Sequence, residues 1–119
     1  MPKSTFFRSL VIVASSAGLS LALALPASAQ VDVEAARLLF KQNECGKCHN
    51  PTKNKKGPSL RKTARDYKDK ANAEQEIIKH LTTPKKVKLD DGTEEDHQLV
   101  ETTKDPKALA NLARWILSH

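Results

Sequence analysis

The sequence predicts an all-α domain of about four short helices. Apolar residues recur every three or four positions in several segments, whereas no segment alternates apolar and polar residues as a half-buried strand does. Residues that cap helices stand before the first, third and last of these segments. The segments between them are rich in Lys, Asn, Pro and Gly or in mixed charges, which is typical of loops.

The first helix is expected to start near Asp32, its N-cap residue, and to end just before Cys45. A loop follows over residues 50–59, and a short second helix is expected over residues 60–66. The apolar face of the first helix consists of Val33, Ala36, Leu39 and Phe40.

The third helix is predicted from Asn72-Ala73-Glu74-Gln75, which resembles a capping box. It is expected to run to residue 82, because Pro84 cannot continue a helix. A second loop over residues 84–104 contains the turn signal Asp91-Gly92 and mixed charges. The inner face of the third helix consists of Ala73, Ile77 and Leu81.

The last helix is predicted to begin with Asp105 as its N-cap and Pro106 in its first position, an order that helix starts favour. Trp115 flanks its apolar stripe. The stripe consists of Leu109, Leu112, Ala113 and Ile116.

The N-terminal segment has the anatomy of a secretory signal peptide. Lys3 and Arg8 form a positive region, residues 10–25 are apolar, and Ala27-Ser28-Ala29 is an A-x-A cleavage site. We expect residues 1–29 to be removed before Gln30, which leaves residues 30–119 as one domain. The alternative is an uncleaved anchor, but the apolar run is short for a membrane span.

The segment Cys45-Gly46-Lys47-Cys48-His49 holds both cysteines and has the pattern of a c-type haem attachment site. Thiols three positions apart can form thioethers to the two vinyl groups of a haem, and the histidine can then ligate the iron from the proximal side. The alternatives are a redox-active cysteine pair, a structural disulfide or half of a zinc site. Zinc would need two more ligands at a matching spacing, and no second cysteine pair exists.

A redox motif of the thioredoxin kind would follow a strand in a βαβ pattern, which is absent from this sequence. One covalently bound haem c is therefore the expected cofactor. In bacteria haem is attached outside the cytoplasm, which agrees with the export signal and predicts a periplasmic protein.

Three groups of residues resemble those of class I cytochromes c, over nearly all of residues 30–119. Ala36 and Phe40 precede the haem motif as in the family's first helix, although the family more often has glycine in place of this alanine. Gly57-Pro58-Ser59-Leu60 is similar to the family's Gly-Pro-x-Leu, and Leu109, Leu112, Trp115 and Ile116 are similar to its last helix.

This resemblance implies the class I cytochrome c fold, with about four short helices wrapped around one haem. It also implies that Pro58 packs on His49 and that its carbonyl accepts the Nδ1–H of that ring, a contact that fixes the tautomer and raises ligand basicity. Leu60, from the same motif, is a further expected haem-binding residue. Cys45, Cys48 and His49 are the attachment and proximal-ligand residues that the resemblance implies.

The second axial ligand departs from the family pattern. Class I cytochromes usually supply a methionine from the loop before the last helix, but the only methionine here is Met1, in the signal peptide. His97 stands where the family places its methionine, so we expect His49 and His97 to ligate the iron. His80, on the third helix, and an open or exchangeable site remain as alternatives, whereas His119 ends the chain.

Two classes of function follow. The first is a periplasmic electron carrier with a six-coordinate His/His haem, whose potential is low because histidine donates more strongly than methionine sulfur. The second is a haem protein whose open or displaceable distal site binds a small ligand. No acid–base pair, phosphate loop or nucleophile–base arrangement is visible, so an enzyme is not expected.

The formal net charge of +6 is unevenly distributed. The basic residues either keep the protein soluble or form a rim that attracts redox partners with an acidic surface. The small excess and the few aromatic residues argue against nucleic-acid binding. We expect a monomer without stable membrane insertion after signal cleavage. The basic residues after the haem motif and after the third helix are Lys53, Lys55, Lys56, Arg61, Lys62, Arg65, Lys85, Lys86 and Lys88.

Overall fold

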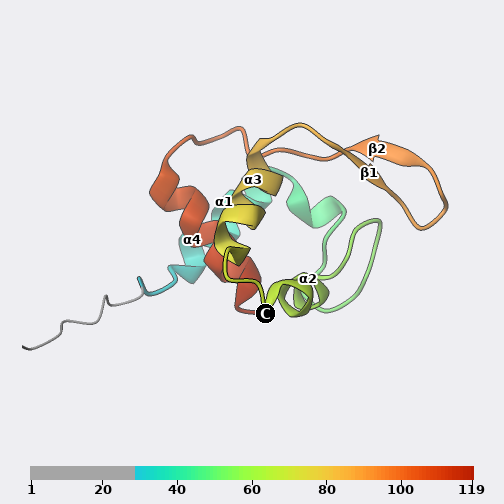
Figure 1. The fold of residues 1–119 in the computed structure, drawn as a ribbon. Helices are drawn as coiled ribbons and strands as arrows, with labels where there is room; N and C mark the ends of the chain where they lie inside the picture. The colour runs from blue at the N-terminus through green and yellow to red at the C-terminus, as the bar shows by residue number, and fades with distance from the viewer. Residues whose placement is uncertain (1–28) are drawn as a thin grey trace, which may run out of the picture.

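The computed structural model describes residues 29–119, so the basic and apolar regions of the predicted signal peptide lie outside the described residues. Within this range no helix is long and apolar enough to cross a membrane. The four helices are α1 (Val33–Gln42), α2 (Leu60–Tyr67), α3 (Ala73–Thr82) and α4 (Pro106–Leu117), and a short 3-10 helix, η1 (Cys45–Lys47), follows α1 (Figure 1). The all-α prediction is confirmed.

Helix α4 forms the centre of the core, because it packs against α1, α2 and α3. Leu112 and Ala113 of this helix are fully buried. At the crossing with α1, Ala36 is also buried, and the rings of Phe40 and Trp115 meet edge to face with centroids 5.4 Å apart. Small residues at the crossing thus allow close approach, while the aromatic pair fills the space beside it.

Hydrogen bonds also join the start of the domain to α4. The Asn111 side chain accepts a hydrogen bond from the Asp32 backbone N–H and donates one to the Asp32 carbonyl, both at 2.8 Å. One amide side chain therefore satisfies both backbone polar groups of a residue 79 positions away in the sequence.

The helix caps agree with the sequence in two of three predicted cases. Asp32 accepts a hydrogen bond from the Ala35 N–H, and Asp105 accepts one from the Lys107 N–H. The capping box at Asn72 is wrong. The Asn72 backbone has φ −108° and ψ 25°, away from the extended conformation of an N-cap, and its side chain donates to the Glu76 carboxylate instead.

The loop predicted over residues 84–104 contains two short antiparallel strands, β1 (Lys86–Lys88) and β2 (Glu94–Asp96). The expectation of no strands was therefore wrong at this position. Each strand has only three residues and is almost wholly charged, so no apolar alternation marks it. Opposite charges face each other across the pair instead, because Lys86 lies opposite Asp96 and Lys88 opposite Glu94.

The hairpin extends away from the helices on one side of the molecule (Figure 1). Its turn contains Asp91-Gly92, as the sequence predicts. Gly92 has φ +86°, a left-handed conformation that glycine adopts without strain, and the Asp91 carboxylate accepts a hydrogen bond from the Thr93 N–H.

The core predicts a clear difference between two leucine substitutions. Leu112→Ala is expected to lower the free energy of unfolding by about 2–5 kcal/mol, because it leaves a cavity at the centre of the helix packing. Leu38→Ala is the matched control: this side chain is 56% exposed on α1, and its removal should change stability by less than about 0.5 kcal/mol. Chemical denaturation of the two variants measures both values, and equal effects would contradict this description of the core.

Candidate functional site

The two cysteines and His49 lie in one tight turn after α1. The chain turns at Glu44, which has φ +56°, and η1 follows directly. The Cys45 carbonyl accepts hydrogen bonds from the backbone N–H groups of both Cys48 and His49, at 3.2 and 3.0 Å. This arrangement fixes the relative positions of the two sulfur atoms and the imidazole.

Both thiols are free, so the alternative of a structural disulfide is not formed in the structure. Cys45 is buried, and this burial raises the pKa of its thiol to about 11. The Cys45 sulfur is therefore protonated at neutral pH, which does not suit a nucleophilic redox cysteine.

Asn43 anchors this turn to the segment that precedes α4. Its side chain is buried and donates hydrogen bonds to the Leu39 carbonyl and to the Thr102 hydroxyl. Its Oδ1 also accepts a hydrogen bond from the Glu101 N–H at 2.9 Å. The sequence gives no sign of this role, because Glu101 and Thr102 lie almost 60 residues further along the chain.

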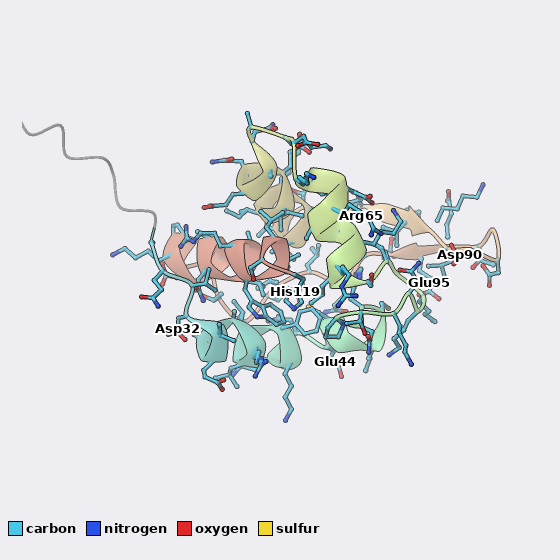
Figure 2. All side chains as sticks on the ribbon, turned by 90° about the horizontal axis from the view of Figure 1, so that it is seen from below. Asp32, Glu44, Arg65, Asp90, Glu95 and His119 are labelled. Carbon is cyan, nitrogen blue, oxygen red and sulfur yellow. The ribbon has the colours of Figure 1, made fainter. Side chains whose placement is uncertain are left out.

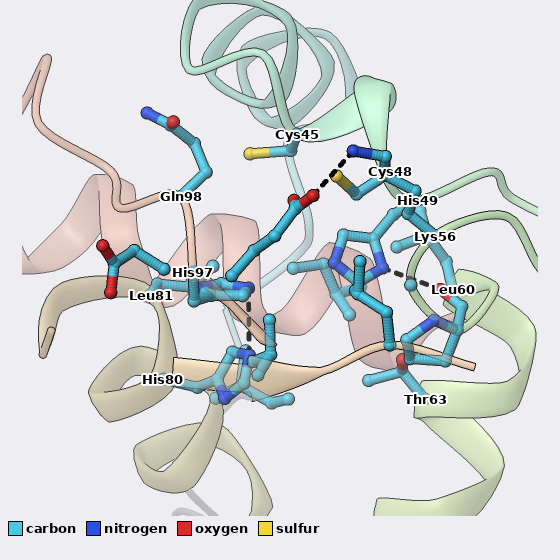
Figure 3. Close-up of a pocket in the computed structure, with 18 of the residues that line it drawn as sticks. Cys45, Cys48, His49, Lys56, Leu60, Thr63, His80, Leu81, His97 and Gln98 are labelled. Carbon is cyan, nitrogen blue, oxygen red and sulfur yellow. Dashed lines mark hydrogen bonds and ion pairs between the residues drawn. The ribbon is translucent and has the colours of Figure 1, made fainter. Parts of the chain in front are cut away.

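A pocket lies beside this turn and is lined by residues of the haem motif, α2, α3, the hairpin and α4. On one side of this pocket, His49 is held by the loop that follows it. Its Nδ1 lies 2.7 Å from the Pro58 carbonyl oxygen (Figure 3). Since a carbonyl only accepts, the ring proton stands on Nδ1 and the lone pair of Nε2 is left for a metal. This is the contact that the resemblance to class I cytochromes implied.

Gly57 packs against the same ring. A Cβ at this position would lie 2.6 Å from His49 Cε1 and 3.0 Å from Nδ1, so only glycine fits without displacing the imidazole. The Gly57 backbone N–H also donates to the Cys48 carbonyl at 2.9 Å. The glycine of Gly57-Pro58-Ser59-Leu60 was a signal for this role in the sequence, although no role was assigned to it.

On the opposite side, His97 is fixed at the base of the hairpin, where its backbone N–H donates to the Lys85 carbonyl at 2.8 Å. His80 on α3 lies beside it, with 3.0 Å between the two Nε2 atoms (Figure 3). Both candidates for the distal ligand are therefore on the same side of the pocket. His119 lies elsewhere, with its ring against Trp115.

Burial favours the neutral form of His80 and His97. Burial lowers the pKa of His97, and burial together with the neighbouring His97 and Lys85 lowers the pKa of His80 to about 4. A neutral imidazole is the form that binds a metal. His97 Nδ1 is buried and has no hydrogen-bond partner in the described part of the chain.

The spacing of the proximal and distal rings fits one iron between them. The ring centroids of His49 and His97 are 6.2 Å apart. Metal–imidazole bonds of about 2.0–2.1 Å, as for zinc, place the centroids of two rings on opposite sides of one metal roughly 6 Å apart. The observed distance is of the size that such a ligand pair has.

The rest of the pocket suits a large apolar plate that brings its own metal. Its apolar walls come from α2, α3, the hairpin and α4, and the two cysteines lie at its edge. In residues 29–119 no three His, Cys, Asp or Glu side chains are grouped to hold a bare metal ion, so the zinc alternative lacks ligands there. Haem iron already has four ring nitrogens and needs only two more. The wall residues are Leu60, Ile77, Leu81, Val87, Leu89 and Ile116.

An ion pair links the two sides of the pocket mouth. Lys56, on the loop beside His49, has its Nζ 2.9 Å from Glu95 Oε1 on β2, and both side chains are exposed. Pairing with Glu95 raises the pKa of Lys56. Figure 2 shows Glu95 on the hairpin with Asp90 toward its tip, whereas Arg65 lies on α2.

Comparison with known proteins gives a consistent result. The family model for cytochrome c matches residues 33–119. The crystal structure of class 1 cytochrome MtoD from Sideroxydans lithotrophicus ES-1 is similar at 46% identity, with a TM-score of 0.71, over 75% of this chain and 97% of that chain. Wild-type Nitrosomonas europaea cytochrome c552 is similar at 26% identity, with a TM-score of 0.54, over 69% and 96%. The search of curated proteins gives no match.

Proposed function

We propose that this chain, which belongs to the cytochrome c family, carries single electrons between redox partners in the periplasm. Its cofactor is one covalently bound haem c, and its fold is that of class I cytochromes. The observation that carries the proposal is the pair of imidazoles, His49 and His97, which face each other across an apolar pocket with both cysteines at its edge.

In this proposal each residue has a distinct task. Cys45 and Cys48 form the thioethers, His49 is the proximal ligand and His97 the distal ligand. Pro58 fixes the tautomer of His49 through its carbonyl, and Leu60 contributes to the apolar wall. The haem supplies a reversible one-electron change at its iron.

The protein contributes rigidity and electronic tuning to this exchange. The Pro58 carbonyl accepts from the His49 ring, and the Lys85 carbonyl accepts from the His97 backbone N–H, so the His49 imidazole and the backbone that carries His97 are both held in place. Neither ring has to move when the charge of the iron changes. Two histidine ligands favour the ferric state, so we propose a lower potential than in Met-ligated members of the family.

A basic surface on α2 supports docking of an acidic redox partner. Of the basic residues that follow the haem motif, Lys56 and Lys62 are paired with carboxylates, whereas Arg61 and Arg65 form no ion pair with the described residues. Arg61, Arg65 and Lys68 line one shallow depression. Unpaired charges of one sign attract a partner of the opposite sign at a rate that falls as salt rises.

The proposal is tested on the protein from the periplasmic fraction of a bacterial host. Mass spectrometry should show a chain that starts at Gln30 and carries one haem that survives acid–acetone extraction. A redox titration should give one reversible one-electron step, with a low-spin ferric form. Carbon monoxide bound by the reduced wild type would favour the small-ligand alternative, and a retained N-terminus would favour the uncleaved anchor.

A further inference from the structure

We propose that His80 is a reserve distal ligand, positioned to bind the iron when His97 is absent or displaced. This inference rests on the haem site proposed above. The two histidines are alternative ligands of one coordination position, with a fixed order of preference.

The side chains of His80 and His97 lie close together. The Nε2 atoms of His80 and His97 are 3.0 Å apart, and the ring centroids are 4.1 Å apart with an interplanar angle of 64°. Both nitrogens therefore converge on the same point of the pocket. A metal bonded to His97 Nε2 at about 2 Å lies within about 5 Å of His80 Nε2. Removal of the His97 ring clears the space between that nitrogen and the metal.

The hydrogen bonds of His80 and His97 set the order of the two ligands. Lys85 Nζ lies 2.9 Å from His80 Nδ1, and a lysine ammonium can only donate, so His80 Nδ1 accepts. The His80 proton is then on Nε2, which donates to the lone pair of His97 Nε2. Because His97 accepts at Nε2, its proton stands on Nδ1, which is the tautomer that binds iron through Nε2 once the hydrogen bond from His80 opens. His80 must in addition move its own proton to Nδ1 and release the ammonium of Lys85.

That release has a modest cost. Lys85 is exposed, and its ammonium can turn toward water, so water replaces the hydrogen bond that Lys85 gives up to His80. The arrangement makes His97 the preferred ligand and leaves His80 available. The iron accordingly remains six-coordinate with either histidine.

The test compares three variants of the haem-loaded protein: His97→Ala, His80→Ala and the double variant. Each single variant should keep a low-spin ferric spectrum and bind no carbon monoxide when reduced, because the other histidine ligates. The double variant should be high-spin and should bind carbon monoxide. Absorption and electron paramagnetic resonance spectra measure the spin state, and circular dichroism with haem content checks that each variant folds.

Each other outcome overturns the proposal in a recognisable way. A high-spin His97→Ala variant shows that His80 does not reach the iron, although His97 keeps its role. A high-spin His80→Ala variant makes His80 the native ligand. A low-spin double variant assigns the position to another group, such as a lysine of the hairpin.

Two controls separate these outcomes from a failure of the haem site itself. His119→Ala in the His97→Ala background should remain low-spin, because His119 packs against Trp115, away from the His80–His97 pair. Absence of covalent haem in the wild type would contradict the proposed function. The spectra above, by contrast, can be recorded only on protein that carries haem, so they test the role of His80 alone.

Discussion

Replacement of both Cys45 and Cys48 by serine is expected to abolish covalent haem and to remove most of the cooperative unfolding transition. The walls of the pocket are apolar side chains from α2, α3, the hairpin and α4, and a bound haem would extend the apolar core that these side chains form. A domain of this size buries little apolar surface on its own, so a bound apolar plate accounts for much of its core. The variant should therefore lose helical structure as well as the absorption of the haem.

Mass spectrometry after acid–acetone extraction measures the attached haem, and thermal circular dichroism measures the transition. The matched control is Leu38→Ser, a polar substitution on the exposed face of α1, which should keep both haem and transition. A double cysteine variant whose haem survives acid–acetone extraction, or that melts like the wild type, would refute the role given to the two thiols.

Gly57→Ala should displace His49 and weaken its bond to the iron. The added Cβ would lie 2.6 Å from His49 Cε1, well inside van der Waals contact, so the ring or the loop must shift. Either movement lengthens the hydrogen bond to the Pro58 carbonyl, which is 2.7 Å in the wild type. Overpacking of this kind costs about 1–3 kcal/mol, enough to give a mixed-spin haem and a less stable protein.

Gly46→Ala is the control for this substitution. A Cβ on Gly46 meets only Phe40 Cε1, at 3.6 Å, which is an ordinary contact, and Gly46 lies in the same haem motif. Spectra and thermal stability should therefore be close to those of the wild type. Two alanine variants with the same spectrum would show that the approach of Gly57 to His49 has no consequence for the iron.

The parts of the fold that depend on local sequence were predicted well. Asp32 and Asp105 cap helices because a short acidic side chain before an apolar stripe has a nearby N–H to accept from. The covalent haem c and the class I fold likewise follow from Cys45-Gly46-Lys47-Cys48-His49 and the residues around it, and both are confirmed by the family match.

Features that depend on distant contacts were not predicted. The hairpin is held by pairs such as Lys86–Asp96, and its charged residues look like a solvated loop when the two halves are considered separately. The meeting of His80 and His97 depends on the same hairpin, since the Lys85 carbonyl fixes the His97 backbone beside the end of α3. Ligation by His97 remains a prediction.

The central position of α4 has a consequence for the order of biosynthesis. Synthesis and export both begin at the N-terminal end of a chain, so the haem motif at residues 45–49 emerges before α4, which spans Pro106–Leu117. Before that last helix is present, α1, α2 and α3 lack the surface against which they pack, and Asn111 cannot form its hydrogen bonds with Asp32. In an exported chain, the two thiols would therefore reach the site of haem attachment before the core can close over them.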